Sequence, residues 1–213
     1  MLAAEALWAR FDYPVISAYT HLLRILQNKD YFVLTSNIDG QFIKAGFDPQ
    51  RVFEPQGSIA LLQCSRPCCD MLWDGEPFYR QIARDIDPVS FSCPTEDIPH
   101  CPHCGAPLVQ NLRGPGCFIP RETMKNRQPF ENFMKEAEHS STLFLELGVG
   151  FNSPGLIRHH FQRLTWLWPN ARLIRFNRDY PSTPKKLGER ALPVGGDLKE
   201  NLLKLDRFCQ EEL

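Results

Sequence analysis

Apolar and polar positions recur along the first sixty residues with two different periods, and these periods predict the elements. Residues 3–28 place large apolar side chains at roughly helical spacing, with a break expected at Pro14. Residues 31–35, YFVLT, are a continuous apolar run typical of a buried parallel strand, and the polar segment SNIDG follows it. Residues 41–47 are expected to form a short helix closed by Gly46, and residues 51–58 a second short strand with a turn.

The C-terminal part of the chain repeats this alternation with longer elements. We expect a helix within residues 121–141, a buried strand over 142–150, a helix over 153–168, a strand over 171–177 and a closing helix over 195–213. This order predicts an open parallel α/β sheet. Ligands bind at the C-terminal ends of strands in such sheets, so the loops at 35–41, 148–153 and 177–180 are the candidate site loops.

The pattern changes between residues 64 and 117, where prolines, cysteines and acidic residues interrupt short apolar runs. This composition predicts a small, loop-rich subdomain inserted into the α/β domain. The predicted boundaries are 1–62 and 119–213 for the two parts of the α/β domain, and 63–118 for the inserted module.

Composition and charge narrow the choice of partners. The chain has 213 residues, 43% of them hydrophobic, and a formal net charge of -1, which gives no general electrostatic reason to expect nucleic acid or an anionic membrane as a partner. No apolar run approaches the ~20 residues that a membrane span requires. We therefore expect a globular, cytoplasmic protein.

Eight cysteines are too few for a disulfide scaffold in a chain of this length, and seven of them lie between residues 64 and 117. Cys64 and Cys68 form a C-x3-C hook, and Cys101 and Cys104 form a C-x2-C hook, with 32 residues between Cys68 and Cys101. Two such hooks predict a tetrahedral zinc site with a structural role. Cys69, His103 and Cys117 remain competing ligands, and a set of buried free thiols is the alternative interpretation.

Asn37 and Asp39 lie two residues apart on the loop that follows the first predicted strand. An amide and a carboxylate at this place can bind ribose hydroxyls or a carboxamide group. The alternative is that the two side chains only form an Asx-type turn.

The order of motifs from residue ~30 onward resembles the sirtuin family: VLTSNIDGQFIKAG, VFEPQGS, the first cysteine hook, CPHCG, LFLELGVG and LIRFN. The segments NIDGQF, AGF, LQCSRPC and NLRG are most similar to those of the class M sirtuins, which are often encoded beside a macrodomain. The resemblance implies an α/β fold with a Rossmann-like parallel sheet, incomplete because the N-terminal strand is missing, and a small inserted zinc-binding module. It also implies NAD and zinc as cofactors.

The resemblance assigns roles to particular residues. It implies that Asn37 and Asp39 hold the nicotinamide ribose and carboxamide, while Thr35 and Ser36 shape the same pocket. It places Gly148 and Val149 at the adenosine ribose and Asn177 at the adenine end. The resemblance also implies a protein substrate, with a lipoylated carrier related to the glycine-cleavage H protein as the acceptor and a macrodomain protein as a further partner.

Gln56 stands where a deacylating sirtuin has its histidine general base. An amide has no useful pKa near 7, so it can orient a group but cannot take its proton. We therefore expect Asn37 and Gln56 to serve ADP-ribosyl transfer, whose oxocarbenium-like transition state depends on dipoles and positioning. A weak deacylase and a non-catalytic zinc-binding remnant are the alternatives.

The glycine-rich phosphate loop of sirtuins has no counterpart upstream of residue 31, because the first 30 residues contain no glycine. Glycine-loop backbone amides are the main anchor for a pyrophosphate. We expect the sequence to be a fragment whose Gly-Ala-Gly strand lies upstream, and a degraded copy is the alternative.

Overall fold

The computed structural model describes residues 2–66, 68–114, 116–152 and 154–211. The chain divides into two compact units that interleave along the sequence. Unit 1 comprises residues 1–14, 37–41 and 54–125, and unit 2 comprises residues 15–36, 42–53 and 126–213. Within the described residues, no helix combines the length and the apolar character that a membrane crossing needs.

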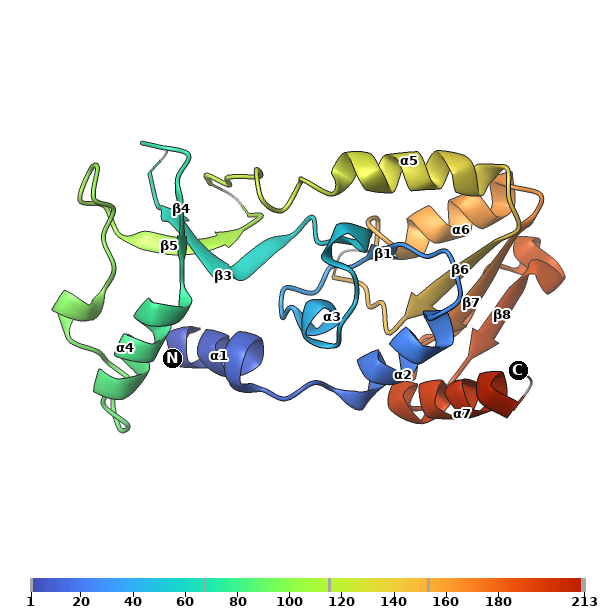
Figure 1. Cartoon of the computed structure of the whole chain (residues 1–213), viewed down its shortest axis with the longest axis horizontal. Helices are drawn as coiled ribbons and strands as arrows, with labels where there is room; N and C mark the ends of the chain where they lie inside the picture. The colour runs from blue at the N-terminus through green and yellow to red at the C-terminus, as the bar shows by residue number, and fades with distance from the viewer. Residues whose placement is uncertain (1, 67, 115, 153, 212–213) are drawn as a thin grey trace. The chain divides into compact units, whose positions relative to one another are not determined.

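The centre of unit 1 is a three-stranded antiparallel sheet in the order β4-β3-β5 (Figure 1). Its strands are β3 (Gly57–Cys64), β4 (Leu72–Asp74) and β5 (Leu108–Leu112). The helices of unit 1 are α1 (Leu2–Leu7), the π-helix η1 (Trp8–Asp12), α4 (Glu76–Asp85) and the 3-10 turn η3 (Thr95–Asp97). Ala6 and Leu7 of α1 pack with Ile59, Leu62 and Tyr79 in one apolar core.

Unit 2 contains two parallel sheets, which confirms the predicted α/β class. One pairs β1 (Val33–Leu34) with β2 (Val52–Phe53), and the other has the order β6-β7-β8, with β6 (Thr142–Leu147), β7 (Ala171–Phe176) and β8 (Ala191–Val194). The register places Leu147 opposite Phe176, so β6 and β7 end side by side. The loops that follow them therefore start from one edge of the sheet.

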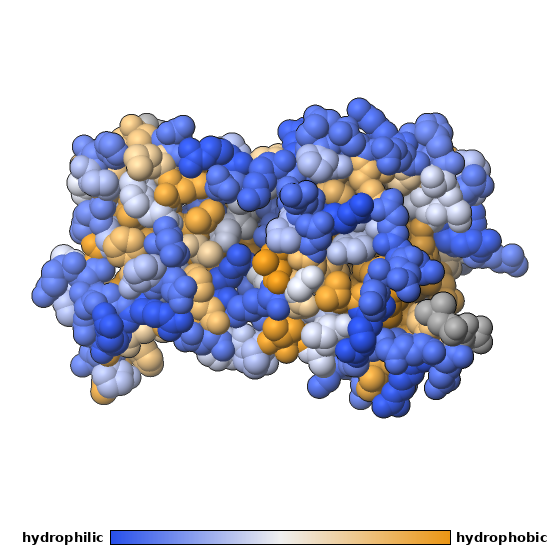
Figure 2. All heavy atoms as spheres, viewed as in Figure 1, coloured by the Kyte–Doolittle hydropathy of each residue, from blue (hydrophilic) through white to orange (hydrophobic). Residues whose placement is uncertain are grey.

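The α-helices of unit 2 are α2 (Ser17–Leu26), α3 (Gln41–Lys44, of which Gln41 belongs to unit 1), α5 (Arg127–Glu138), α6 (Arg158–Leu167) and α7 (Leu198–Glu211). Two 3-10 turns, η2 (Pro49–Arg51) and η4 (Lys185–Arg190), complete it. Hydrophilic side chains cover most of the visible faces of α5 and α7 (Figure 2), as expected for helices with one apolar stripe.

The element predictions hold for the long periodic segments and fail for short or polar ones. The helix expected at 3–28 is interrupted over residues 13–16, where Pro14 lies, as predicted. The strand expected at 31–35 covers only Val33–Leu34. The inserted segment contains a ten-residue helix, α4, that its polar composition concealed, and β8 was also missed. Position 153 of the second site loop and residues 212–213 of the closing helix lie outside the described residues.

The two units differ from the predicted boundaries 1–62, 63–118 and 119–213. Residues 1–14 belong to unit 1 because Ala6 and Leu7 pack into its core beside Tyr79 of α4. Residues 57–62 belong there because they are part of the central strand β3. The inserted module is therefore larger than its cysteine-rich segment.

Candidate functional sites

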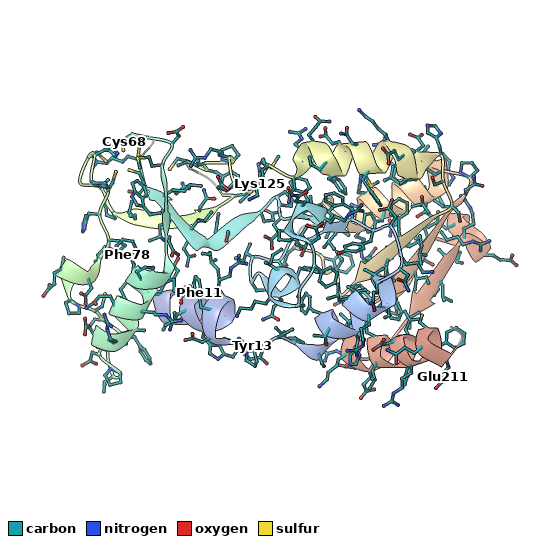
Figure 3. The ribbon with its side chains drawn as sticks, in the orientation of Figure 1. Phe11, Tyr13, Cys68, Phe78, Lys125 and Glu211 are labelled. Atoms are coloured by element: carbon teal, nitrogen blue, oxygen red, sulfur yellow. The ribbon has the colours of Figure 1, made fainter. Side chains whose placement is uncertain are left out.

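Four cysteine sulfurs in unit 1 converge at one point. The Sγ atoms of Cys64, Cys68, Cys101 and Cys104 lie within 4.8 Å of one another, and the figure of side chains shows Cys68 among other sulfur atoms (Figure 3). The Cys64–Cys68 distance is 3.4 Å, and the Cys64–Cys104 and Cys68–Cys101 distances are 3.5 Å. Tetrahedral zinc with bonds of ~2.3 Å needs sulfur separations of about 3.8 Å. The donor set and its spacing fit a four-coordinate zinc ion.

Backbone amides donate to two of these sulfurs and lower the pKa of each, although at Cys64 burial is the larger effect and leaves the pKa raised. The amide of Arg66 donates to the sulfur of Cys64 across 3.4 Å. Burial raises the pKa of Cys101, but hydrogen bonds from the backbone amides of His103 and Cys104, together with those from the neighbouring cysteine thiols, outweigh it and lower that pKa to about 6. Since zinc is bound by thiolates, these turns favour the metal-binding form of the site.

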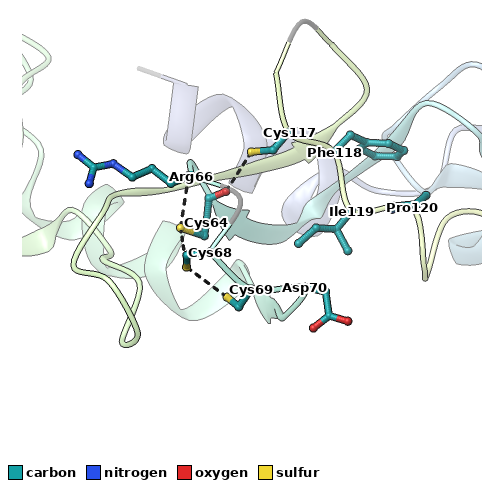
Figure 4. A pocket seen from close by; sticks show the side chains of 9 residues that line it. All are labelled: Cys64, Arg66, Cys68, Cys69, Asp70, Cys117, Phe118, Ile119 and Pro120. Carbon is teal, nitrogen blue, oxygen red and sulfur yellow. Dashed lines mark hydrogen bonds between the residues drawn. The ribbon is translucent and has the colours of Figure 1, made fainter.

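The structure decides among the competing ligands. Cys68 is in the sulfur cluster and Cys69 is not, although their sulfurs are 3.6 Å apart. The thiol of Cys117 donates to the carbonyl of Cys64, and the Nε2 of His103 lies 3.2 Å from the sulfur of Met71. A recess of about 430 Å³ borders the cluster; Figure 4 shows its lining, which includes Cys69, Cys117 and Phe118.

Three of the predicted site residues, Asn37, Asp39 and Gln56, belong to unit 1. Asn37 is exposed, and Asp39 Oδ1 accepts a hydrogen bond from the amide of Gln41 across 3.0 Å, which forms an Asx turn at the start of α3. The alternative considered for Asp39 is thus present in the structure. This bond occupies one carboxylate oxygen and is compatible with a ligand at the other.

Gln56 lies in the tight turn that precedes β3, where the amide of Gly57 donates to the carbonyl of Glu54. Arg113 holds this turn in two ways: its amide donates to the carbonyl of Gln56 across 2.9 Å, and its Nε donates to the carbonyl of Pro55 across 3.0 Å. The main chain at Gln56 is therefore fixed by Arg113, which directly follows β5 and to which the sequence assigned no role.

Two further charged residues lie around the same loops, Arg10 and Glu54. Burial raises the pKa of Glu54, the positive charge of Arg10 opposes this rise, and the negative charge of Asp39 adds to it. Nη1 of Arg10 is buried and, among the described residues, has no hydrogen-bond partner. The sequence offers no local signal for Arg10, because it lies 30 residues upstream of Gly40, the residue it packs against.

The remaining predicted site residues, Thr35, Ser36, Gly148, Val149 and Asn177, belong to unit 2. Thr35 is buried directly after β1, and its amide donates to the carbonyl of Phe53. Gly148 has a φ of +63° at the end of β6, a conformation that favours glycine.

Asn177 joins the two site loops of unit 2. Its Nδ2 donates to the carbonyl of Val149 across 2.9 Å, and its Oδ1 accepts from the amides of Asp179 and Tyr180 across 3.2 and 2.9 Å. Two of the three candidate site loops therefore lie side by side within the described residues. The amide of Asn177 is engaged with the backbone on both sides, which makes this residue a support for the loops.

A buried charged cluster lies beneath these loops. Arg175 forms a bidentate pair with Glu146, with distances of 2.7 and 2.9 Å, and Nε of Arg158 lies 3.4 Å from the same carboxylate. All three side chains are buried. Desolvation and the charge of Arg175 lower the pKa of Arg158, and Glu146 opposes them. Arg158 also donates to the carbonyl of Tyr180 across 2.6 Å, so the cluster anchors the loop after β7.

Comparison with known proteins identifies the class of this fold. A mutant of a Sir2 homologue in complex with ADP-ribose matches with a TM-score of 0.63 at 17% identity, covering 99% of this chain and 73% of that one. Sir2Tm bound to a propionylated peptide matches with a TM-score of 0.64 at 19% identity, covering 97% and 76%. The chain has the sirtuin fold, with an inserted four-cysteine module.

Two curated proteins are similar in sequence. A protein ADP-ribosyltransferase of Staphylococcus aureus (strain Mu50 / ATCC 700699) is 30% identical over 189 residues, which are 88% of this chain and 59% of that protein. A probable bifunctional ADP-ribose hydrolase/ADP-ribosyltransferase of Fusarium oxysporum f. sp. cubense is 30% identical over 162 residues, or 73% of this chain and 26% of that protein. No protein-family model matches the chain. The chain therefore shares the sirtuin fold and is similar in sequence to these two proteins, and it spans about three fifths or less of their length.

Proposed function

We propose that the protein is a sirtuin-type, NAD-dependent protein ADP-ribosyltransferase that releases nicotinamide and transfers ADP-ribose to an acceptor protein. The observation that carries this proposal is the amide of Gln56 at the position where a deacylating sirtuin has a histidine. The names of the two curated relatives support it, since both include ADP-ribosyltransferase. The fold supports it as well, because a Sir2 homologue with this fold binds ADP-ribose.

In this proposal NAD supplies the reactive glycosidic bond, and the residues of this chain bind and orient it. Asn37 and Asp39 hold the nicotinamide ribose and carboxamide, and Gln56 directs its amide dipole at the reacting ribose. The loops at Gly148, Val149 and Asn177 bind the adenosine part, and Thr35 and Ser36 of the same unit also contribute to NAD binding. Cys64, Cys68, Cys101 and Cys104 hold a zinc ion that stabilises unit 1, and a cytoplasmic location suits such thiolates.

The acceptor we propose is a lipoylated carrier protein of the glycine-cleavage H type, as in class M sirtuins, with a macrodomain protein as a further partner. Support comes from the sequence motifs around Asn37, Cys64 and Arg113, which resemble those of class M sirtuins. The name of the Fusarium relative, which joins an ADP-ribose hydrolase to a transferase, agrees with such a partnership.

The test uses the full-length protein with radiolabelled NAD and the lipoylated carrier. We expect label on the carrier and release of nicotinamide, with the unlipoylated carrier as the matched control. Absence of label with intact NAD contradicts the proposal.

Deacylation is the competing activity, and Gln56→His separates the two. If the missing base is the reason that deacylation is disfavoured, this variant gains it by about 100-fold or more while transfer falls. If wild type already removes acyl groups efficiently, the role proposed for Gln56 is wrong.

A further inference from the structure

A rigid loop in unit 1, residues 86–92, presents two large apolar side chains to solvent. We name it the Asp87 loop; it follows the last residue of α4 and lies beyond the end of that helix in Figure 1. Oδ1 of Asp87 accepts hydrogen bonds from the amides of Val89 and Ser90 across 2.9 and 2.7 Å. The main chain of Asp87 also bonds to Ser92 and Phe91, across 2.8 and 2.9 Å. These bonds fix the loop in the absence of any partner.

The side chains of Val89 and Phe91 bury little of their apolar surface in this position. Val89 is 86% exposed and Phe91 is 60% exposed. Phe91 also has a φ of +53°, and it is the one non-glycine residue in the described parts of the chain with a positive φ. A bulky residue in this region is strained. A strained aromatic side chain held out into solvent is unfavourable for folding and is therefore a functional candidate.

The surroundings of the loop are acidic. Residues 84–112 contain four carboxylates, namely Asp85, Asp87, Glu96 and Asp97, against one basic side chain, Arg84, so four negative charges and one positive charge leave a formal charge of -3. Asp85 ends α4, where the helix dipole already places negative charge. Oδ2 of Asp97 is buried and has no hydrogen-bond partner among the described residues. The loop therefore carries an apolar tip in a negative field.

We propose that the Asp87 loop is the docking element for the acceptor protein, and that the acceptor offers an apolar recess bordered by lysine and arginine. This inference rests on the proposed transferase function. An aromatic side chain on a pre-organised loop is the kind of residue that dominates binding energy at interfaces. The negative field repels anionic lipid headgroups and nucleic acid phosphates, and it steers a basic protein surface toward the tip.

The first experiment compares Phe91→Ser with Phe208→Ser. Phe208 on α7 in unit 2 is 59% exposed, so the control matches residue type and exposure. Binding of the lipoylated carrier is measured by calorimetry without NAD, and its KM is measured with NAD. We expect Phe91→Ser to weaken both about 10-fold or more, as removal of an interface anchor does. We expect Phe208→Ser to change neither, and nicotinamide release without acceptor to be the same in all three proteins.

A second variant separates docking from loop structure. Phe91→Gly removes the side chain and relieves the positive φ, so we expect unit 1 to be as stable as wild type or more stable while carrier binding is lost. Glu96→Lys tests the charge: carrier binding should weaken, and its dependence on salt should become shallower. Equal carrier affinity for wild type and Phe91→Ser, or no binding of the carrier to wild type, overturns the docking proposal. If the docking proposal fails in one of these two ways but wild type still transfers label to the carrier, the transferase function stands. If wild type binds the carrier through Phe91 but transfers no label, the transferase function is wrong and the docking proposal stands.

Discussion

The guanidinium of Arg10 lies directly against Gly40, so that a Cβ on residue 40 would be 1.8 Å from Nη1 of Arg10. This relationship joins the middle of the π-helix η1 to the loop that carries Asn37 and Asp39, all within unit 1. It makes residue 40 the place where the position of Arg10 can be changed without removing its charge.

We predict that Gly40→Ala displaces Arg10 at a modest cost in stability. Gly40 has a φ of +68°, and alanine there costs about 1–2 kcal/mol of backbone strain. The clashing atoms belong to the flexible end of the Arg10 side chain, which can swing away. The control is Gly105→Ala, because Gly105 has a φ of +69° with open space around it. Urea unfolding should show similar losses for both variants, and a much larger loss for Gly40→Ala would mean that Arg10 cannot move.

The charge around Glu54 predicts pKa changes of opposite sign in two variants. Arg10 lowers and Asp39 raises the pKa of Glu54, which burial has already raised. Arg10→Met should therefore raise this pKa further and Asp39→Asn should lower it, as followed by carbon NMR of the labelled Glu54 carboxyl between pH 3 and 9. Gly40→Ala should act in the same direction as Arg10→Met. Identical titration curves in all four proteins would show that these charges do not reach Glu54.

The four-cysteine cluster and the loops show what sequence could predict and what it could not. The hooks Cys64/Cys68 and Cys101/Cys104 were predictable because ligand geometry requires short spacing along the chain. The strand end before Asn37 was predictable because a buried parallel strand is a continuous apolar run. The contact between Arg10 and Gly40 was not, since it depends on how α1 and η1 pack in unit 1.

The engagement of Asn177 with the carbonyl of Val149 could not be predicted either. An asparagine at a strand end can serve a ligand or the backbone, and only the spatial path of the second loop decides which. The resemblance places Asn177 at the adenine end of NAD, and that role stays a prediction.

The sulfur geometry predicts which of two adjacent cysteines binds zinc. Cys68→Ser should lower zinc affinity by more than about 100-fold. Loss of a residue that only supports a zinc ligand already costs up to about 100-fold, and Cys68 is expected to bind the zinc directly. Cys69→Ser should keep one equivalent of zinc, because its sulfur lies outside the cluster. Atomic absorption after dialysis against a graded chelator measures both. The reverse order of the two variants would assign the site to Cys69.

The contact between α2 and α7 predicts a pH-dependent contribution to stability. Asp206 of α7 is buried; its Oδ2 accepts from Nε of Arg24 across 2.8 Å and lies 2.7 Å from Nδ1 of His21. Hydrogen bonding to Arg24 lowers the pKa of Asp206, desolvation opposes this, and the bond to His21 lowers it further. Because its folded pKa lies below its unfolded value of about 3.9, the ionised form stabilises the fold above pH ~4. This contribution is lost as pH falls through the lower, folded pKa.

Asp206→Asn should therefore reduce the free energy of unfolding by about 1–3 kcal/mol at pH 7, the cost of removing hydrogen bonds to charged groups. The matched control is Glu211→Gln, which changes an exposed carboxylate of the same helix. In urea unfolding series from pH 7 down to pH 2.5, the difference in the free energy of unfolding between wild type and Asp206→Asn should be constant to about pH 4 and should then decrease toward zero. A difference that stays constant to pH 2.5 would mean that the Asp206 side chain acts through its packing, because an effect of its charge must disappear once Asp206 is protonated in both the folded and the unfolded protein.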